Sequence, residues 1–101
     1  MAFTLKPRVS RKRFPGLQFN LVINGLEKDL TGATVNLLLN DKVVFSTTTG
    51  TLIFSDRTHG KVQLPAQVLN LPPANYHVEL KYLFADGTDT SGDGYWLITP
   101  K

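Results

Sequence analysis

Short runs in which apolar and polar side chains alternate recur along the chain, and this pattern limits the possible folds more than any other feature. The clearest runs lie at residues 17–23, 35–39 and 76–84. Alternation places successive apolar side chains on one face of a β-strand, and the longer apolar period of an amphipathic helix is absent. Turn-forming residues separate the runs at intervals of roughly 8 to 12 residues, which is typical of a sandwich or a barrel. The sequence therefore predicts an all-β domain of antiparallel strands.

The same pattern predicts which side chains point inward and where the chain turns. We expect Val35, Leu37 and Leu39 to share one buried face. Leu30 is expected to anchor the preceding polar loop to the core, and residues 65–70 to form one helical turn. The remaining expected features are a first strand that Pro7 limits, turns at Asn24-Gly25, 40–42, 56–60 and Asp86-Gly87, and a last strand from Gly94 to Thr99.

The length and composition favour a single globular domain. The 101 residues suffice for one core, and no linker divides them, so residues 1–101 are predicted to form one β-sandwich domain. The absence of cysteine excludes disulfide frameworks, cysteine–zinc sites and thiol nucleophiles. No stretch approaches the roughly 20 apolar residues of a membrane-spanning helix, and the N-terminus lacks the apolar region of a secretory signal. We expect a soluble protein, made in the cytoplasm, that contacts no membrane.

Positive charge is concentrated near the N-terminus. Five of the 11 basic residues precede the first acidic one, and the chain after Arg13 carries six basic and eight acidic residues, a balance of −2. The densest part, Arg11-Lys12-Arg13, lies in residues 6–16, the chain's candidate for a flexible basic arm. Such an arm can be solvated or protect a sheet edge, can dock onto a protein, or can contact the phosphates of nucleic acid. Stacking aromatic residues are not interleaved with the charges apart from Phe14, which argues against nucleic acid.

A proline-rich corner precedes the longest predicted strand. Tyr76 enters that strand shortly after Pro72 and Pro73. Its hydroxyl can therefore bond to the backbone a few residues upstream, which is the tyrosine corner of immunoglobulin-like sandwiches. Together with the strand rhythm, this feature predicts an antiparallel immunoglobulin-like β-sandwich of about seven strands.

Three segments in a fixed order also resemble a known family. They are residues 29–35, where a loop enters a strand, residues 60–62, followed by 71–76, and the hairpin at 84–88. Through them, residues 17–99 resemble the immunoglobulin-like N-terminal domain of phage baseplate upper proteins and related small β-sandwich proteins of phage tails and prophages.

The resemblance implies a structural or adaptor module of a phage or prophage tail assembly that acts through protein–protein contacts. The implied partners are other virion or tail proteins, or further copies of the chain in a homo-oligomer. The protein would be made in the host cytoplasm and remain associated with the virion. Contacts would involve exposed strand edges or the run Arg11-Lys12-Arg13, which departs from the short segment that opens the first strand in the family.

The residues that could carry catalysis show no catalytic pattern. His59 precedes a glycine in a predicted turn, and His77 lies on the polar face of a predicted strand beside Glu79 and Lys81. None of the serines lies in a G-x-S-x-G nucleophile elbow. We therefore predict that the protein is not an enzyme and needs no cofactor.

Three aspartates near the last hairpin raise the question of calcium. Asp86, Asp89 and Asp93 alternate with glycines, and carboxylates on flexible loops suit calcium. Their spacing does not match the EF-hand pattern, and Asp-Gly is ordinary hairpin chemistry. We therefore predict no metal site.

Tyr95 and Trp96 are adjacent in the last predicted strand and must point to opposite faces. At least one of them should leave the core, which makes the pair candidates for a protein interface, since both residue types dominate binding hot spots. The alternative function is carbohydrate binding at a cell surface, through an exposed platform around Trp96 flanked by Asp89 and Asp93.

Overall fold

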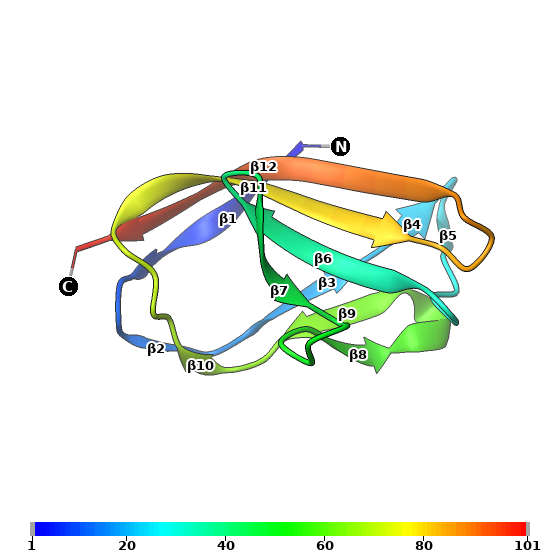
Figure 1. Ribbon diagram of the computed structural model, residues 1–101, viewed down its shortest axis with the longest axis horizontal. Helices are drawn as coiled ribbons and strands as arrows, with labels where there is room; N and C mark the ends of the chain where they lie inside the picture. Colours follow the sequence, from blue (N-terminus) through cyan, green and yellow to red (C-terminus); the bar gives the residue numbers. More distant parts are fainter. Residues whose placement is uncertain (1, 101) are drawn as a thin grey trace.

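Two β-sheets account for most of the chain in the computed structural model, which describes residues 2–100 and the side chains of residues 5–100 (Figure 1). The fold is compact and all-β, and the one helical element in the described residues is a 3-10 turn, η1 (Arg57–His59). The strands are β1 (Ala2–Val9), β2 (Arg13–Phe14), β3 (Leu17–Asn20), β4 (Val22–Ile23), β5 (Leu26–Glu27), β6 (Thr34–Leu39), β7 (Lys42–Ser46), β8 (Ile53–Asp56), β9 (Lys61–Leu64), β10 (Gln67–Val68), β11 (Ala74–Leu83) and β12 (Asp89–Thr99).

The larger sheet is mixed and has five strands in the order β1-β12-β11-β6-β7. β1 runs parallel to β12, and the other neighbouring pairs are antiparallel. β11, which lies at the centre, pairs with β12 along all 10 of its residues.

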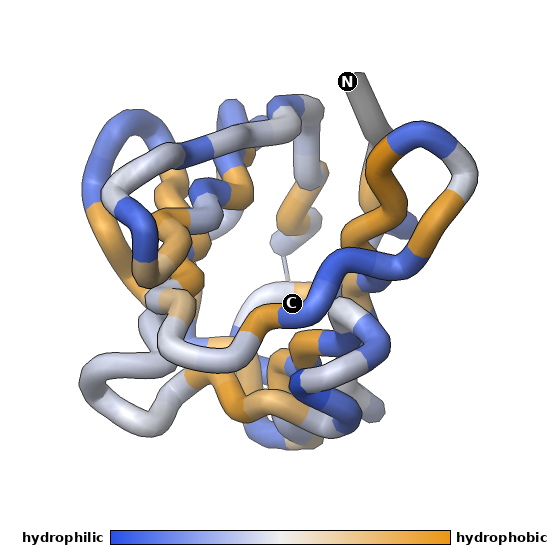
Figure 2. Tube along the Cα trace, turned by 90° about the vertical axis from the view of Figure 1, so that its right-hand side faces the viewer, coloured by the Kyte–Doolittle hydropathy of each residue, from blue (hydrophilic) through white to orange (hydrophobic). Residues whose placement is uncertain are grey.

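The smaller sheet is antiparallel, with three strands in the order β3-β9-β8. Two short pairs, β10 with β2 and β4 with β5, lie outside these sheets. Figure 1 shows the smaller sheet beneath the larger one. Figure 2 shows the trace end-on, with hydrophobic and hydrophilic segments distributed around the molecule.

The interior follows from the alternation in the sequence. Val35, Leu37 and Leu39 are buried on one face of β6, and Leu30 is buried before it, as the sequence predicts. Burial of apolar surface is the dominant favourable term in folding, and strands of both sheets contribute to one cluster. Its members are Phe14, Leu21, Leu30, Val35, Leu37, Leu39, Phe45, Leu52, Val62, Leu64, Leu69, Val78, Leu80, Tyr82, Trp96 and Ile98.

Two hairpins turn through left-handed residues, as expected from their sequences. Asn24 and Gly25 have φ values of 54° and 78°, and Asn40 and Asp41 have 51° and 68°. Positive φ at both central residues defines the type I′ turn, which matches the twist of the flanking strands. The register confirms a two-residue loop in each hairpin, since Ile23 pairs with Leu26 and Leu39 with Lys42.

β1 continues through Pro7, which corrects the expected limit of the first strand. Leu5 pairs with Trp96, and the register then shifts before Arg8. Such an irregularity tolerates proline, because the ladder there does not need the N–H that proline lacks. The strand ends only at Val9.

Two other expectations, a helical turn and the start of the last strand, were wrong. Residues 65–70 form no helical turn, since Gln67 and Val68 make strand β10 against β2. The last strand begins at Asp89 instead of Gly94, and extends the β11–β12 hairpin up to its turn. In both places cross-strand pairing decides the conformation, because the preference of a residue for a strand depends strongly on its context.

Residues 6–16 do not stand apart from the body as an arm. Their first part belongs to β1 and their last part contains β2. Between these strands the Arg11 N–H donates to the Leu69 carbonyl at 2.7 Å, and the Leu69 N–H donates to the Lys12 carbonyl at 3.1 Å. Phe14 then enters the core. The basic run is therefore a tight corner held by backbone hydrogen bonds.

Candidate functional site

An apolar hairpin, β4–β5, lies at one end of the sandwich (Figure 1). Its side chains Val22, Ile23 and Leu26 are 47%, 39% and 73% exposed. A hydrogen bond from the Lys28 N–H to the Leu21 carbonyl, 3.0 Å long, closes its base. Grouped exposed apolar residues mark interaction sites more often than single ones do.

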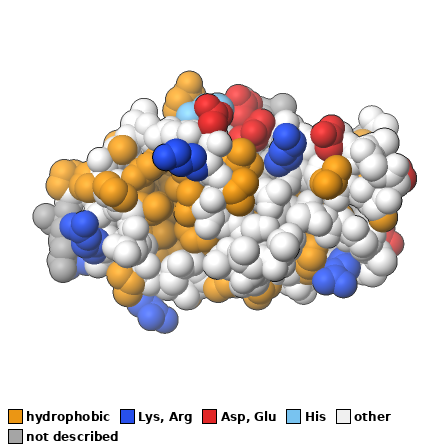
Figure 3. Space-filling view, in the orientation of Figure 1, with side chains coloured by type: hydrophobic (Ala, Val, Ile, Leu, Met, Phe, Trp, Pro, Cys, Tyr) orange, Lys and Arg blue, Asp and Glu red, His pale blue; other side chains and the backbone are white. Residues whose placement is uncertain are grey.

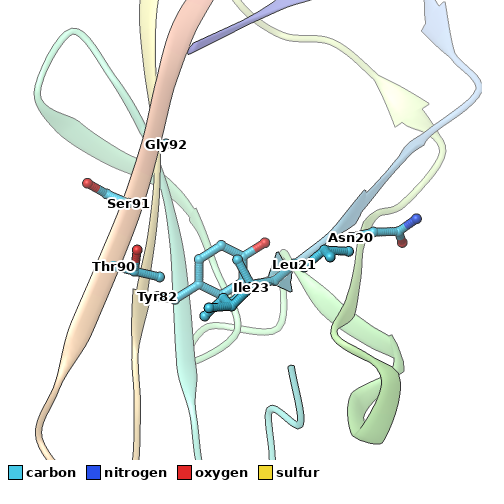
Figure 4. A pocket seen from close by; sticks show the side chains of 8 residues that line it. Asn20, Leu21, Ile23, Tyr82, Thr90, Ser91 and Gly92 are labelled. Atoms are coloured by element: carbon cyan, nitrogen blue, oxygen red, sulfur yellow. The ribbon is translucent and has the colours of Figure 1, made fainter. Parts of the chain in front are cut away.

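A cavity of about 160 Å³ lies between this hairpin and the larger sheet (Figure 4). Leu21 and Ile23 line it from the hairpin side, and Tyr82, Thr90 and Gly92 line it from β11 and β12. Since Gly94 and Trp96 are buried and side chains alternate along a strand, positions 90 and 92 also face inward. Glycine at position 92 contributes no side chain and so leaves room on this face.

Tyr82 is the polar group of the cavity. The residue is only 3% exposed, and its burial raises the pKa of the hydroxyl to about 12. No hydrogen bond joins the Tyr82 hydroxyl to another described residue. Every fully buried side-chain polar atom in the described residues has a partner, so the Tyr82 hydroxyl oxygen is not fully buried. The hydroxyl therefore opens into the cavity, and Figure 4 shows it directed toward Leu21. A hydroxyl that opens into a cavity and that no described residue engages can donate a hydrogen bond to a ligand.

A polar group lies on the outer face of the larger sheet. The ring nitrogen Nε2 of His77 is 3.4 Å from Oδ2 of Asp93, and the His77 ring meets the Tyr95 ring edge-on with centroids 5.6 Å apart. Figure 3 shows acidic side chains and a histidine gathered along the upper margin, where Figure 1 has β11 and β12. The group is flat and exposed, so it offers polar contacts without an enclosed site.

Of the predicted aromatic pair, Tyr95 is 56% exposed and Trp96 is 1% exposed. Trp96 packs against Phe14 at 5.7 Å between ring centroids. The interpretation of Trp96 as an interface residue is therefore wrong, and the aromatic platform expected around it does not form. Tyr95 stays a candidate contact residue.

The basic run Arg11, Lys12 and Arg13 is exposed, and no ion pair engages these residues in the part of the chain that the structure describes. The neighbouring Arg8 differs, because its guanidinium lies over the Phe14 ring, 5.2 Å from the centroid. Three free cations at one corner can still meet an anionic partner.

Tyr76 forms the hydrogen bond that its position suggested. Its hydroxyl donates to the Pro72 carbonyl, four residues upstream, at 2.6 Å. The bond ties the start of β11 to the preceding corner, which is the structural role that the sequence predicted for Tyr76.

The three aspartates, Asp86, Asp89 and Asp93, do not form a cluster, because one lies in the hairpin turn and the other two lie at separate positions along β12. Asp86 caps the hairpin turn, accepting hydrogen bonds from the Thr88 N–H and hydroxyl, and these bonds lower its pKa. Asp89 and Asp93 lie in β12, and Asp93 pairs with His77. Among residues 2–100 no group of three or more acidic or histidine side chains is arranged to hold a metal ion.

His59 belongs to a local pair at η1. Its Nδ1 is 2.9 Å from Oδ2 of Asp56, and this hydrogen bond raises the pKa of His59 and lowers that of Asp56. Both side chains are exposed, so the pair holds a turn and encloses no substrate space.

Sequence reasoning placed Tyr82 on the inward face of its strand but did not identify the cavity. The available signal was the pair of glycines at positions 92 and 94, which removes two inward side chains from β12 beside Tyr82. The alternating run 17–23 predicted that Ile23 shares a buried face with Leu21, and this was wrong: Leu21 is buried, but the chain then turns into the separate hairpin β4–β5, where Ile23 is exposed. The sequence therefore carried no signal for the exposure of this hairpin.

Comparisons with models of protein families, with curated proteins and with solved structures found no match for this chain. A search of residues 2–100 for a helix long and apolar enough to cross a membrane also found none.

Proposed function

We propose that residues 2–100 form an immunoglobulin-like sandwich. The strand orders support this assignment: with β3, β6, β7, β8, β9, β11 and β12 as strands B, C, C′, D, E, F and G, the sheets read C′-C-F-G and D-E-B. The tyrosine hydrogen bond near the start of β11 stands where the tyrosine corner of strand F is found. β1 adds a further strand beside G.

We propose further that the domain is a non-catalytic structural or adaptor module that acts by contact with other proteins. The observation that carries this proposal is the β4–β5 hairpin, which presents Val22, Ile23 and Leu26 to solvent at one end of the fold. Removing such side chains from water on docking is favourable by about 25 cal/mol per Å² of apolar surface. The resemblance of residues 17–99 to small phage-tail proteins makes the tail of a phage or prophage particle the preferred setting.

Particle association tests the proposal directly. After prophage induction in cells of the source organism, the chain should sediment with assembled particles, in fixed ratio to the tail proteins. Leu26→Asp should remove it from the particle fraction, because a charge would be buried in the contact. Val43→Asp is the matched control, since Val43 is 57% exposed on the edge strand β7. A chain found only outside particles, or a Leu26→Asp variant that sediments normally, contradicts the proposal.

A further inference from the structure

Two short strand pairs lie outside the sheets, toward opposite ends of the molecule (Figure 1). The pair of β2 with β10 contains Arg13, and the pair of β4 with β5 contains Glu27. The molecule measures 41 Å along its long axis, against 23 and 22 Å across it. Because they lie at opposite ends of this axis, the two pairs cannot contact each other within one copy of the chain.

Each strand pair presents an apolar side chain beside a charged one. Directly opposed residues of an antiparallel pair have their side chains on the same face. Val68 is opposed to Arg13 in the first pair, and Val22 is opposed to Glu27 in the second. All four side chains are exposed, Val68 by 53%. The two surfaces therefore match in kind, with charges of opposite sign.

The end that carries β2 and β10 is positive. Residues 6–13 hold five basic residues and no acidic one. Figure 3 shows Lys and Arg side chains toward the left end, where Figure 1 has these strands. Arg11 has a φ of 57°, which is unfavourable for a long side chain, whereas the other described non-glycine residues of positive φ are asparagine or aspartate, which tolerate it. The fold thus keeps a cation at this corner in spite of local backbone strain.

The end that carries β4 and β5 is negative. Residues 26–31 and 84–89 meet there around a shallow hollow, and together they hold four acidic residues and one basic residue, a balance of −3. Lys28 and the nearby Arg57 lie over aromatic rings, 4.9 and 4.3 Å from the centroids. Glu27 is exposed beside the apolar side chains of the hairpin.

The opposite charges of the chain are kept apart. Among the side chains of residues 5–100, both ion pairs involve a histidine, and no lysine or arginine pairs with a carboxylate. Arg13 and Glu27 are therefore both available to a partner. Complementary charges steer two surfaces together and fix their register, and apolar side chains beside them add the gain from leaving water. A second copy supplies the match to either end, because one chain carries both halves.

We propose that the β2–β10 pair of one copy binds the β4–β5 pair of a second copy, end to end. Arg13 of one copy meets Glu27 of the next, and Val68 packs on Val22 and Leu26. Since the two surfaces differ, each copy retains one unused surface of each kind, and association continues into a ring or a filament. The inference rests on the proposed function as a protein-contact module and identifies the partner of the hairpin.

Sedimentation velocity of the full chain, over concentrations that extend to the millimolar range, tests the contact. The wild type should form species larger than a dimer, and added salt should weaken them. Arg13→Glu and Glu27→Arg should each weaken association at least about tenfold, because each places like charges together. An equal mixture of the two variants should associate again, since opposite charges then face each other. Lys42→Glu is the control for the change in net charge, because Lys42 is exposed on β7, and it should associate normally.

A chain that stays monomeric, association that stops at a dimer, or a mixture that stays dissociated would overturn the inference. A monomeric chain that binds a labelled DNA duplex, and loses it in Arg13→Glu, would assign the basic corner to nucleic acid and would also overturn it. A chain that sediments with particles but does not self-associate leaves the proposed function intact. A chain that self-associates as described but never joins particles retains the contact and loses the tail setting.

Discussion

The indole N–H of Trp96 donates a hydrogen bond to the main-chain carbonyl of Lys6, and so joins the last strand to the first across 3.0 Å. The acceptor lies in the register irregularity of β1 around Pro7. A carbonyl displaced from the regular ladder needs another donor, and the buried indole supplies it. One side chain thereby fills the core and secures the parallel strand.

Trp96→Phe should destabilise the fold by about 1–3 kcal/mol, because it leaves the Lys6 carbonyl without this donor and a gap beside Phe14. Urea unfolding followed by circular dichroism measures the change. Tyr95→Phe, at the neighbouring exposed position, should stay within about 0.5 kcal/mol of the wild type. Equal losses in both variants would show that the indole hydrogen bond adds no stability.

Tyr76→Phe and Tyr82→Phe should differ although both remove one hydroxyl from β11. The Tyr76 hydroxyl bonds to Pro72, so its loss should cost about 0.5–1.5 kcal/mol. The Tyr82 hydroxyl has no partner in the described residues, so its loss should leave the free energy of unfolding nearly unchanged. The same denaturation measurement compares them, and a larger loss for Tyr82→Phe would reveal a protein partner for that hydroxyl.

The alternation of apolar and polar residues predicted the inward faces of β6 and β11, because a strand with one buried face and one solvent-exposed face requires such alternation. The turns at Asn24-Gly25 and Asn40-Asp41 were predictable because few residues tolerate positive φ. The parallel pairing of β1 with β12 was not, since it joins segments at opposite ends of the chain. The cavity was missed for a related reason: it is formed by a hairpin and two strands whose approach depends on the whole fold.

The Asp56–His59 pair should make stability depend on pH in a definite direction. Its hydrogen bond raises the pKa of His59 above the ordinary value of about 6.5, so the contribution is complete below that pH and is lost as pH rises through the folded pKa. The same bond lowers the pKa of Asp56, so on the acid side the contribution is present above about 3.9 and is lost as pH falls through the folded pKa.

Between roughly pH 4 and 6.5 the wild type should therefore exceed Asp56→Asn in stability by the largest margin, and the margin should shrink toward pH 8. NMR titration should also show the pKa of His59 falling in Asp56→Asn. Because both groups are exposed, added salt should reduce the effect. A His59 pKa that does not respond to the substitution would contradict this account.

Gly60 sets the position of the β4–β5 hairpin, and its replacement should be more damaging than that of Gly50, which is also a left-handed turn glycine. The φ of Gly60, 73°, is left-handed, and an added Cβ would lie 2.7 Å from the Leu21 carbonyl oxygen and 2.8 Å from that of Lys28. These two residues form the base of the hairpin. Gly60→Ala therefore combines backbone strain with a clash against main chain, which cannot move aside as a flexible side chain can.

Gly50→Ala is the matched control, because Gly50 has a φ of 80° and open space around the added Cβ. It should cost about 1–2 kcal/mol from strain alone, and Gly60→Ala should cost at least about 1 kcal/mol more, in the range of overpacking. Amide chemical shifts at 22–27 should move in Gly60→Ala and stay fixed in Gly50→Ala. Equal costs with an unmoved hairpin would mean that the contact with Leu21 and Lys28 relaxes freely, and that the hairpin is positioned by its own turn alone.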